Sequence, residues 1–168
     1  MTSTDLSRPA RTTGPHPVTA PESRLLLRRY YTELVSRYYG RATDDAEVDA
    51  VLAQEPSDDL ARPTGEFLVA RIDGVPVGCA GVRVLTSGTA ELTRLYVAPR
   101  TRGMGVATDL VTAAEAVARD TFGALRMRLD TRRDLVEARA LYARLGYREI
   151  AAYNASPYAD HWFEKRLG

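Results

Sequence analysis

The sequence predicts an α/β (α+β) domain, in which a mixed, mostly antiparallel central sheet has helices on both faces. Two observations lead to this prediction. Short apolar strands separated by turn residues follow one another between residues 66 and 97, which is typical of an antiparallel meander. Helices and strands then alternate from residue 106 onward, and a strand reached through a crossover helix pairs in parallel with its predecessor.

Length and composition are those of a single globular domain. The 168 residues are enough to bury a core of their own. A net charge of +1 gives no support to a nucleic-acid partner, and no apolar run is long enough to span a membrane. The one cysteine, Cys79, excludes an internal disulfide and a zinc cluster, so we expect no metal. These features together predict a cytoplasmic protein.

The N-terminal part divides into a predicted tail and a predicted helix. Residues 1–22 are rich in Thr, Ser, Pro and Arg and lack periodicity, so we expect a disordered tail before a single domain over residues 23–168. Apolar residues at helical spacing begin after Ser23 and predict a helix that Gly40 ends.

Capping and turn residues predict the next elements. Asp44 and Glu47 have the spacing of a capping box, which opens a second helix. Asp73 and Gly74 form the turn pair that is favoured in two-residue hairpins. Three strands of the meander are predicted on this basis, over residues 66–72, 75–85 and 90–97.

The C-terminal half alternates between helices and strands. Asp134 and Glu137 predict a second capping pair, which would open the last helix. The elements predicted here are a helix from residue 106, a strand over 125–131, the helix from residue 134, and strands over 147–153 and 161–167.

The third strand of the meander runs through a glycine-bearing turn directly into a helix. Gly103 and Gly105 let the backbone adopt conformations closed to other residues and approach a ligand closely. The free N–H groups of the following helical turn form an anion site, which the helix dipole strengthens. Residues 102–107 are therefore a candidate phosphate site with Arg102 as a nearby cation. The turn is neither a P-loop nor a G-x-G-x-x-G fingerprint, so its spacing alone also fits a tight turn without a ligand.

Two motifs resemble hallmarks of the GNAT acyltransferase superfamily. RLYVAPRTRGMGVATDLV is similar to its acetyl-CoA-binding segment, whose core pattern Arg/Gln-x-x-Gly-x-Gly/Ala falls on Arg102, Gly105 and Ala107. The run from Ala138 to Tyr147 resembles A-x-x-L-Y-x-x-x-G-F/Y. The resemblance covers about residues 23–167 and implies the GNAT fold. It also implies transfer of an acetyl group from acetyl-CoA to a primary amine of a small molecule, amino acid or peptide, by direct attack in a ternary complex.

The resemblance further implies which residues hold the coenzyme. Backbone N–H groups of the glycine turn would bind its diphosphate, and the end of the preceding strand would pair with its pantetheine. The implied cofactor-binding residues are Leu95, Tyr96, Val97, Arg102, Gly103, Met104, Gly105, Val106, Ala107 and Tyr142. Many relatives have Asn or Gln where this chain has Leu135, so one coenzyme hydrogen bond is lost or supplied elsewhere.

The general acid is predicted as one residue, whereas three residues are candidates for the general base. The resemblance implies that Tyr142 is the general acid near the coenzyme sulfur, since a phenol stays protonated at neutral pH and can donate to a thiolate. The general base stays open between Glu91 on the central strand, Asp130 on the next strand, and His161, whose intrinsic pKa suits the task best. Glu91 is our first choice. Each of the three also fits a purely structural role.

Two other functions remain compatible with the sequence. The same fold could serve as a non-catalytic acyl-CoA-binding regulatory or partner module, because a fold does not prove chemistry. The glycine turn could instead hold another phosphate ligand in a nucleotide-binding regulatory domain. Tyr142 and the candidate bases favour an enzyme. The sequence does not identify the amine acceptor, and the resemblance leaves a homodimer open.

Overall fold

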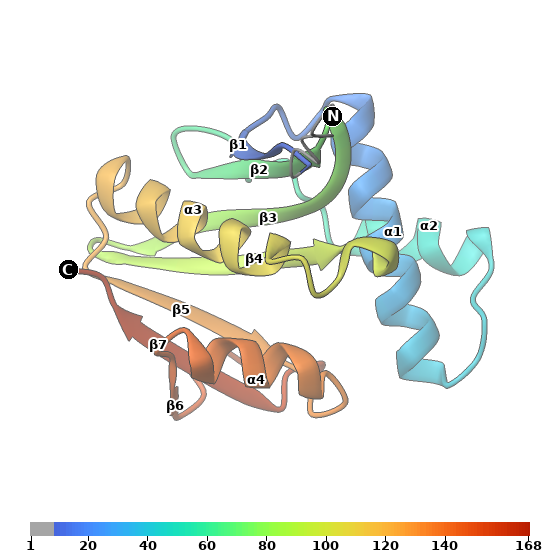
Figure 1. Ribbon diagram of the computed structural model, residues 1–168. Helices are drawn as coiled ribbons and strands as arrows, with labels where there is room; N and C mark the ends of the chain where they lie inside the picture. Colours follow the sequence, from blue (N-terminus) through green and yellow to red (C-terminus); the bar gives the residue numbers. More distant parts are fainter. Residues whose placement is uncertain (1–8) are drawn as a thin grey trace, which may run out of the picture.

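The computed structural model describes residues 9–168, which contain one seven-stranded sheet in the order β1-β2-β3-β4-β5-β7-β6 (Figure 1). The strands are β1 (Arg11–Pro15), β2 (Gly65–Ile72), β3 (Val75–Thr86), β4 (Thr89–Val97), β5 (Arg126–Thr131), β6 (Arg148–Ile150) and β7 (His161–Arg166). The helices are α1 (Pro21–Tyr39), α2 (Asp45–Gln54), α3 (Val106–Asp120) and α4 (Val136–Arg144). Only β4 and β5 pair in parallel, which confirms the predicted mixed, mostly antiparallel sheet.

The N-terminal segment differs from the prediction. Part of the tail predicted for residues 1–22 forms β1, which pairs antiparallel with β2 from Arg11 opposite Ile72 to Pro15 opposite Leu68. This strand is short and polar, so it shows no apolar alternation, and it forms because β2 offers a sheet edge to pair with. Residues 1–8 of the predicted tail lie outside the described residues.

The early turn and capping predictions are confirmed. Asp73 and Gly74 both have positive φ, 49° and 80°, as a tight two-residue hairpin turn requires. The amide of Glu47 donates to the Asp44 carboxylate at 2.8 Å, and the Glu47 carboxylate accepts from the Asp44 amide at 3.4 Å, so the capping box opens α2.

The capping pair predicted at the start of α4 is wrong. Helix α4 begins after Leu135 without a side-chain cap. Asp134 instead binds the guanidinium of Arg132 at 2.9–3.0 Å, and Glu137 pairs with Arg37 of α1. Both carboxylates are drawn to arginines because a charge-assisted hydrogen bond is stronger than one to a neutral backbone amide.

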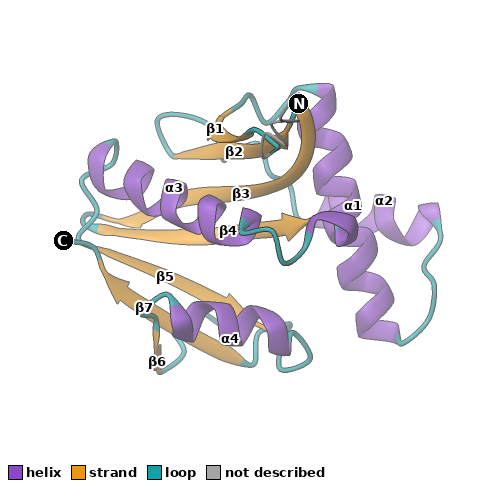
Figure 2. Ribbon diagram, viewed as in Figure 1, coloured by secondary structure: helices purple, strands orange, loops and turns teal. Residues whose placement is uncertain are grey.

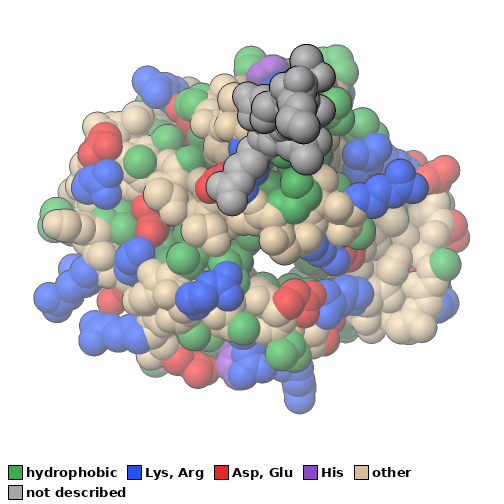
Figure 3. Space-filling model, viewed as in Figure 1, with side chains coloured by type: hydrophobic (Ala, Val, Ile, Leu, Met, Phe, Trp, Pro, Cys, Tyr) green, Lys and Arg blue, Asp and Glu red, His purple; other side chains and the backbone are tan. Residues whose placement is uncertain are grey.

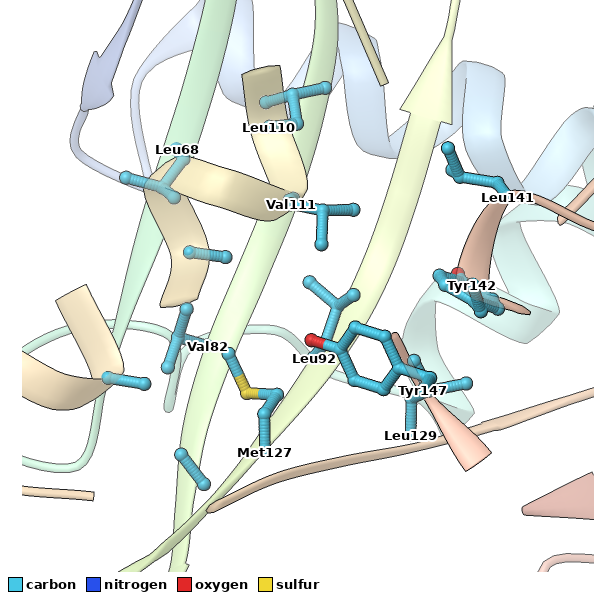
Figure 4. Packing of buried hydrophobic residues seen from close by; sticks show 14 of the residues in the cluster. Leu68, Val82, Leu92, Leu110, Val111, Met127, Leu129, Leu141, Tyr142 and Tyr147 are labelled. Atoms are coloured by element: carbon cyan, nitrogen blue, oxygen red, sulfur yellow. The ribbon is translucent and has the colours of Figure 1, made fainter. Parts of the chain in front are cut away.

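Helices cover both faces of the sheet, as predicted (Figure 2). Helices α3 and α4 lie on one face, and α1 crosses the other with α2 beside it. Alternate residues of β2 enter two cores: Leu68 packs with the α3 side, and Phe67 and Val69 pack with the α1 side. The larger core lies between the sheet and helices α3 and α4 (Figure 4). It contains Val82, Leu92, Leu110, Val111, Met127, Leu129, Leu141, Tyr142 and Tyr147.

Strands β4 and β5 pair briefly and then diverge (Figure 1). Their pairing ends at Glu91 opposite Arg128, although β4 continues to Val97. A β-bulge lies in the part of β4 that no longer pairs with β5 but still pairs with β3. Thr93 is opposite Gly81 and Tyr96 is opposite Cys79, so Arg94 and Leu95 together oppose one residue of β3. The sheet is therefore open between its two halves.

The two C-terminal strands are β6 and β7. One is shorter than predicted, and the other does not lie at the edge of the sheet. The strand predicted over residues 147–153 is ordered as β6 only from Arg148 to Ile150. The last strand, β7, inserts between β5 and β6. None of the helices in residues 9–168 is long and apolar enough to cross a membrane.

Candidate functional site

A cavity of about 1050 Å³ occupies the opening between β4 and β5. Residues from α1, α2, β4, β5, α4 and the loop before β7 line it, so it is reached from both faces of the sheet. Figure 3 shows the hollow between the end of β4 and α4, with charged side chains at its rim. Its volume lies at the upper end of what small-molecule sites have, which suits a long ligand together with a second one.

The glycine turn forms one end of this cavity. Gly103 and Gly105 have φ of 82° and 86°, which explains why glycine is needed at both. The first amide to bond within α3 is that of Asp109, which donates to the Gly105 carbonyl at 3.0 Å, so the preceding N–H groups have no helical partner. Residues Arg102, Gly103, Gly105, Val106 and Ala107 line the cavity, whereas Met104 does not.

Arg11 of β1 lies directly against this turn, which the sequence analysis missed. Its Nη1 donates to the carbonyl of Met104, and its Nε pairs with Asp109 at 3.0 Å. Its Nη1 is 3.1 Å from where a Cβ on Gly105 would lie. The segment around Arg11 carries no local pattern that could have indicated this contact, because the two residues meet only when β1 joins the sheet.

Arg102, predicted as a cation near the phosphate site, lines the cavity and is paired with an acidic residue. Its Nη2 donates to both carboxylate oxygens of Glu33, at 2.8 and 2.7 Å, and its Nε donates to the Val97 carbonyl at 3.1 Å. Glu33 lies on α1, far from Arg102 in the sequence. The side chain of Arg102 therefore ties the turn to α1, and Arg11 brings a second guanidinium to the turn.

The end of β4 forms the wall beside the turn. Leu95, Tyr96 and Val97 all line the cavity, on the stretch of β4 that has lost β5 as a partner. Ideal alternation would put Glu91, Thr93 and Leu95 on one face, but the bulge turns Leu95 toward α3 and Tyr96 toward α1. Backbone groups on this edge need a partner other than a strand.

Glu91 lies buried at the point where β4 and β5 separate. Its Oε2 accepts a hydrogen bond from the Tyr153 hydroxyl at 2.8 Å, and its Oε1 accepts one from Arg83 Nη1 at 3.1 Å. Burial raises the pKa of Glu91, the Tyr153 hydrogen bond opposes this rise, and the charge of Asp130 adds to it. A carboxylate with a raised pKa is a stronger base, so Glu91 is suited to accept a proton.

The structure brings Asp130 to the same cavity and leaves His161 outside it. Asp130 accepts a hydrogen bond from Asn154 at 2.7 Å. His161 is opposite Thr131 in the β5–β7 pair, so it points to the other sheet face from Asp130, and its Nδ1 lies 2.8 Å from a Glu149 carboxylate oxygen. His161 therefore does not face Glu91 or Asp130.

Tyr142 enters the cavity from α4. It is buried, and its ring packs edge-on against Tyr147 at 5.9 Å between centroids (Figure 4). Burial raises the pKa of Tyr142, so its hydroxyl stays protonated and can only be a donor toward an anion. Leu135, at the start of α4, also lines the cavity. Cys79, in contrast, is fully buried among core residues and does not line it.

The chain is similar to known proteins both in sequence and in fold. Residues 27–147 match the model of the Acetyltransferase (GNAT) family. An uncharacterized N-acetyltransferase of Escherichia coli (strain K12) is 34% identical over 123 residues, which cover 69% of this chain and 71% of that protein. One of Schizosaccharomyces pombe is 31% identical over 136 residues, covering 80% and 79%. The structure of an N-acetyltransferase of Thermoplasma acidophilum in complex with coenzyme A superposes with a TM-score of 0.72 at 19% identity, over 94% of this chain and 99% of that chain.

Proposed function

Because this chain belongs to the acetyltransferase (GNAT) family and is an N-acetyltransferase that uses acetyl-CoA, we propose that it acetylates a primary amine by direct attack within a ternary complex. The observation that carries this proposal is the single cavity that joins the glycine turn to Glu91 through the opening between β4 and β5. Acetyl-CoA would enter from the α3 side and the amine from the α1 side. Cys79 is fully buried and does not itself line the cavity, which favours direct transfer over an acyl-enzyme.

In the proposed complex, backbone groups hold most of the coenzyme. The free N–H groups at the start of α3 bind its diphosphate, and the helix dipole adds to this attraction. Arg11 stabilises the turn through the Met104 carbonyl and contributes positive charge. The pantetheine lies along Leu95, Tyr96 and Val97, where its amides replace the missing hydrogen bonds of β5.

The chemical step needs one base and one acid. We propose that Glu91 accepts the proton of the amine, directly or through water, while the amine nitrogen forms a bond to the thioester carbon. A backbone N–H of the bulged strand stabilises the oxyanion. The carbon–sulfur bond then breaks, and the Tyr142 hydroxyl gives its proton to the leaving thiolate. Asp130 is the second candidate for the base, since it lines the same cavity.

A thermal-shift titration tests the coenzyme assignment first. Acetyl-CoA, coenzyme A, ATP and NAD are titrated on the wild type, Gly105→Glu and Gly105→Ala. A ligand at a hundredfold excess over its dissociation constant stabilises the fold by about 2.7 kcal/mol. We expect acetyl-CoA to stabilise the wild type and to lose this effect in Gly105→Glu, which puts bulk and negative charge at the anion site. Gly105→Ala carries the same positive-φ strain without the charge and is the matched control.

The same proteins distinguish the other two functions. A shift with ATP or NAD but none with acetyl-CoA would mean that the glycine turn serves a nucleotide-binding regulatory domain. A shift with acetyl-CoA but no thiol release on a broad amine panel would mean a non-catalytic acyl-CoA-binding module. If thiol is released, Tyr142→Phe should slow turnover without changing the acetyl-CoA shift.

A further inference from the structure

A buried arginine faces the α1 side of the cavity without an acidic partner. Arg94, at the bulge of β4, is 7% exposed and lines the cavity. Its Nε donates to the Ser57 hydroxyl at 3.2 Å, and its Nη1 donates to the Thr93 hydroxyl at 2.8 Å. Within residues 9–168, no carboxylate lies within ion-pair distance of its guanidinium. Its remaining N–H groups, including both on Nη2, are available to a ligand.

This arrangement is unusual because burying a charge is costly unless the charge is paired. The second buried arginine of the cavity, Arg132, follows the rule: it binds both carboxylate oxygens of Asp134. Two acidic groups on the side of Arg94 bind other residues. Asp59 binds Arg83 at 2.5 and 3.2 Å, and Glu91 is held by Arg83 and Tyr153. Arg94 is thus left without an ion-pair partner, although its charge adds to that of Arg83 in lowering the pKa of Asp59.

The fold also holds Arg94 in an unfavourable backbone conformation. Its φ is 56°, in the left-handed region that few residues other than glycine adopt. The Cys79 thiol donates to the Arg94 carbonyl at 3.4 Å, and the Arg94 guanidinium lies 5.5 Å from the centre of the Tyr31 ring. Strain of this kind persists where the surrounding structure fixes it, and it is concentrated at ligand sites.

We propose that Arg94 binds a carboxylate of the acceptor, so that the substrate is a primary amine that also carries a carboxylate, such as an amino acid. A guanidinium with free N–H groups on one edge matches the two oxygens of a carboxylate. The substrate carboxylate supplies the negative ion-pair partner that Arg94 lacks within residues 9–168. The amine of the substrate then points along β4 toward Glu91. This inference rests on the proposed function, because it assigns the acceptor of the same site.

Two measurements on the wild type and Arg94→Asn test the proposal. The first follows thiol release with α-, β- and γ-amino acids and with the carboxamide of each one. The second measures binding of the N-acetylated amino acids and their carboxamides by calorimetry in the presence of coenzyme A, and it needs no turnover. We expect at least one acid to exceed its amide by about 10- to 100-fold in both measurements, and Arg94→Asn to remove that preference. The amides should be little affected by the substitution.

Controls separate carboxylate binding from a structural role. Asparagine tolerates positive φ, so Arg94→Asn should fold and keep its thermal shift with acetyl-CoA. Arg94→Lys keeps the charge and should retain part of the preference for acids. Arg119→Asn, on the exposed surface of α3, should change nothing. Equal binding of acids and amides by the wild type overturns the proposal, and so does an equal loss of both in Arg94→Asn. The absence of thiol release with every amine would contradict the proposed function, while the binding measurement still decides the role of Arg94.

Discussion

The two ends of the cavity are built in different ways. The end at the glycine turn uses consecutive residues of β4, the turn and α3, and it offers mainly backbone groups. The end below α1 and α2 uses side chains from distant segments, such as Glu91, Arg94, Asp130 and Asn154. Backbone recognition depends little on side-chain identity, whereas side-chain recognition changes with each substitution. Proteins with this fold can therefore bind the same coenzyme while the side chains at the other end bind different acceptors.

The charges of the two ends also differ. At the glycine turn, Arg102 is paired with Glu33 and Arg11 with Asp109. At the acceptor end, burial raises the pKa of Glu91, and Arg94 has no acidic partner within the described chain. Unbalanced buried charge is costly for folding, so it is expected where it serves binding or catalysis. Substitutions should then separate into two classes, those that weaken acetyl-CoA binding and those that affect only the acceptor step.

The largest effect is expected from Glu91→Gln, which removes the proposed base at the acceptor end. We expect kcat/KM for the amine to fall by about 10²- to 10⁴-fold, the usual contribution of a general base. The thermal shift with acetyl-CoA should stay as in the wild type, because the glycine turn is untouched. Asp130→Asn is the matched control. A greater loss of kcat/KM in Asp130→Asn than in Glu91→Gln would mean that Asp130, and not Glu91, is the base.

A smaller effect, at the coenzyme end, is expected from Arg11→Ala. The loss of its charge-assisted hydrogen bond to Met104 should raise the dissociation constant of acetyl-CoA about 10-fold. The Michaelis constant of the amine should not change. Calorimetry at two salt concentrations measures the effect, which should shrink as salt rises because part of it is electrostatic. Arg24→Ala, on α1, is the control, and equal losses in both variants would rule out a specific role for Arg11.

Tyr153→Phe should change the pH dependence of the acceptor step. The Tyr153 hydrogen bond lowers the pKa of Glu91 against the effect of burial, so its removal raises this pKa further. Glu91 must be ionised to accept a proton, and the acidic limb of the kcat/KM profile should therefore move to higher pH. Profiles of the wild type and Tyr153→Phe, recorded with the same amine, measure the displacement. An unchanged acidic limb would argue against Glu91 as the base.

The smallest effect is expected from Leu135→Asn at the coenzyme end. Leu135 lines the cavity at the position where the resemblance implies an amide side chain in many relatives, and it precedes α4 without capping it. Asparagine would add one hydrogen bond to pantetheine, worth about 0.5–1.5 kcal/mol, and should tighten acetyl-CoA binding a few-fold. It is also a favoured N-cap residue, so the melting temperature should rise slightly. Leu135→Ala removes the leucine without adding a polar group, and it should not tighten binding.

The sequence by itself determined the features that depend on neighbouring residues. Turn chemistry at Asp73-Gly74, the capping box at Asp44 and the helical periodicity after Gly105 each act over a few residues, and the structure contains all three. The glycine turn belongs to this class, because its conformation and its free N–H groups follow from the local chain. The helix that carries Tyr142 was also predicted, although the capping pair expected to open it does not form.

Only the tertiary structure decided which side chains meet in the cavity. The contacts of Arg11 with Met104, Glu33 with Arg102 and Tyr153 with Glu91 each join residues more than 60 positions apart. The bulge at Arg94 and the sheet face to which His161 points depend on strand register, which shifts a side chain to the opposite face with each residue. Long-range pairing and register are set by packing of the whole sheet, and no short stretch of the sequence encodes them.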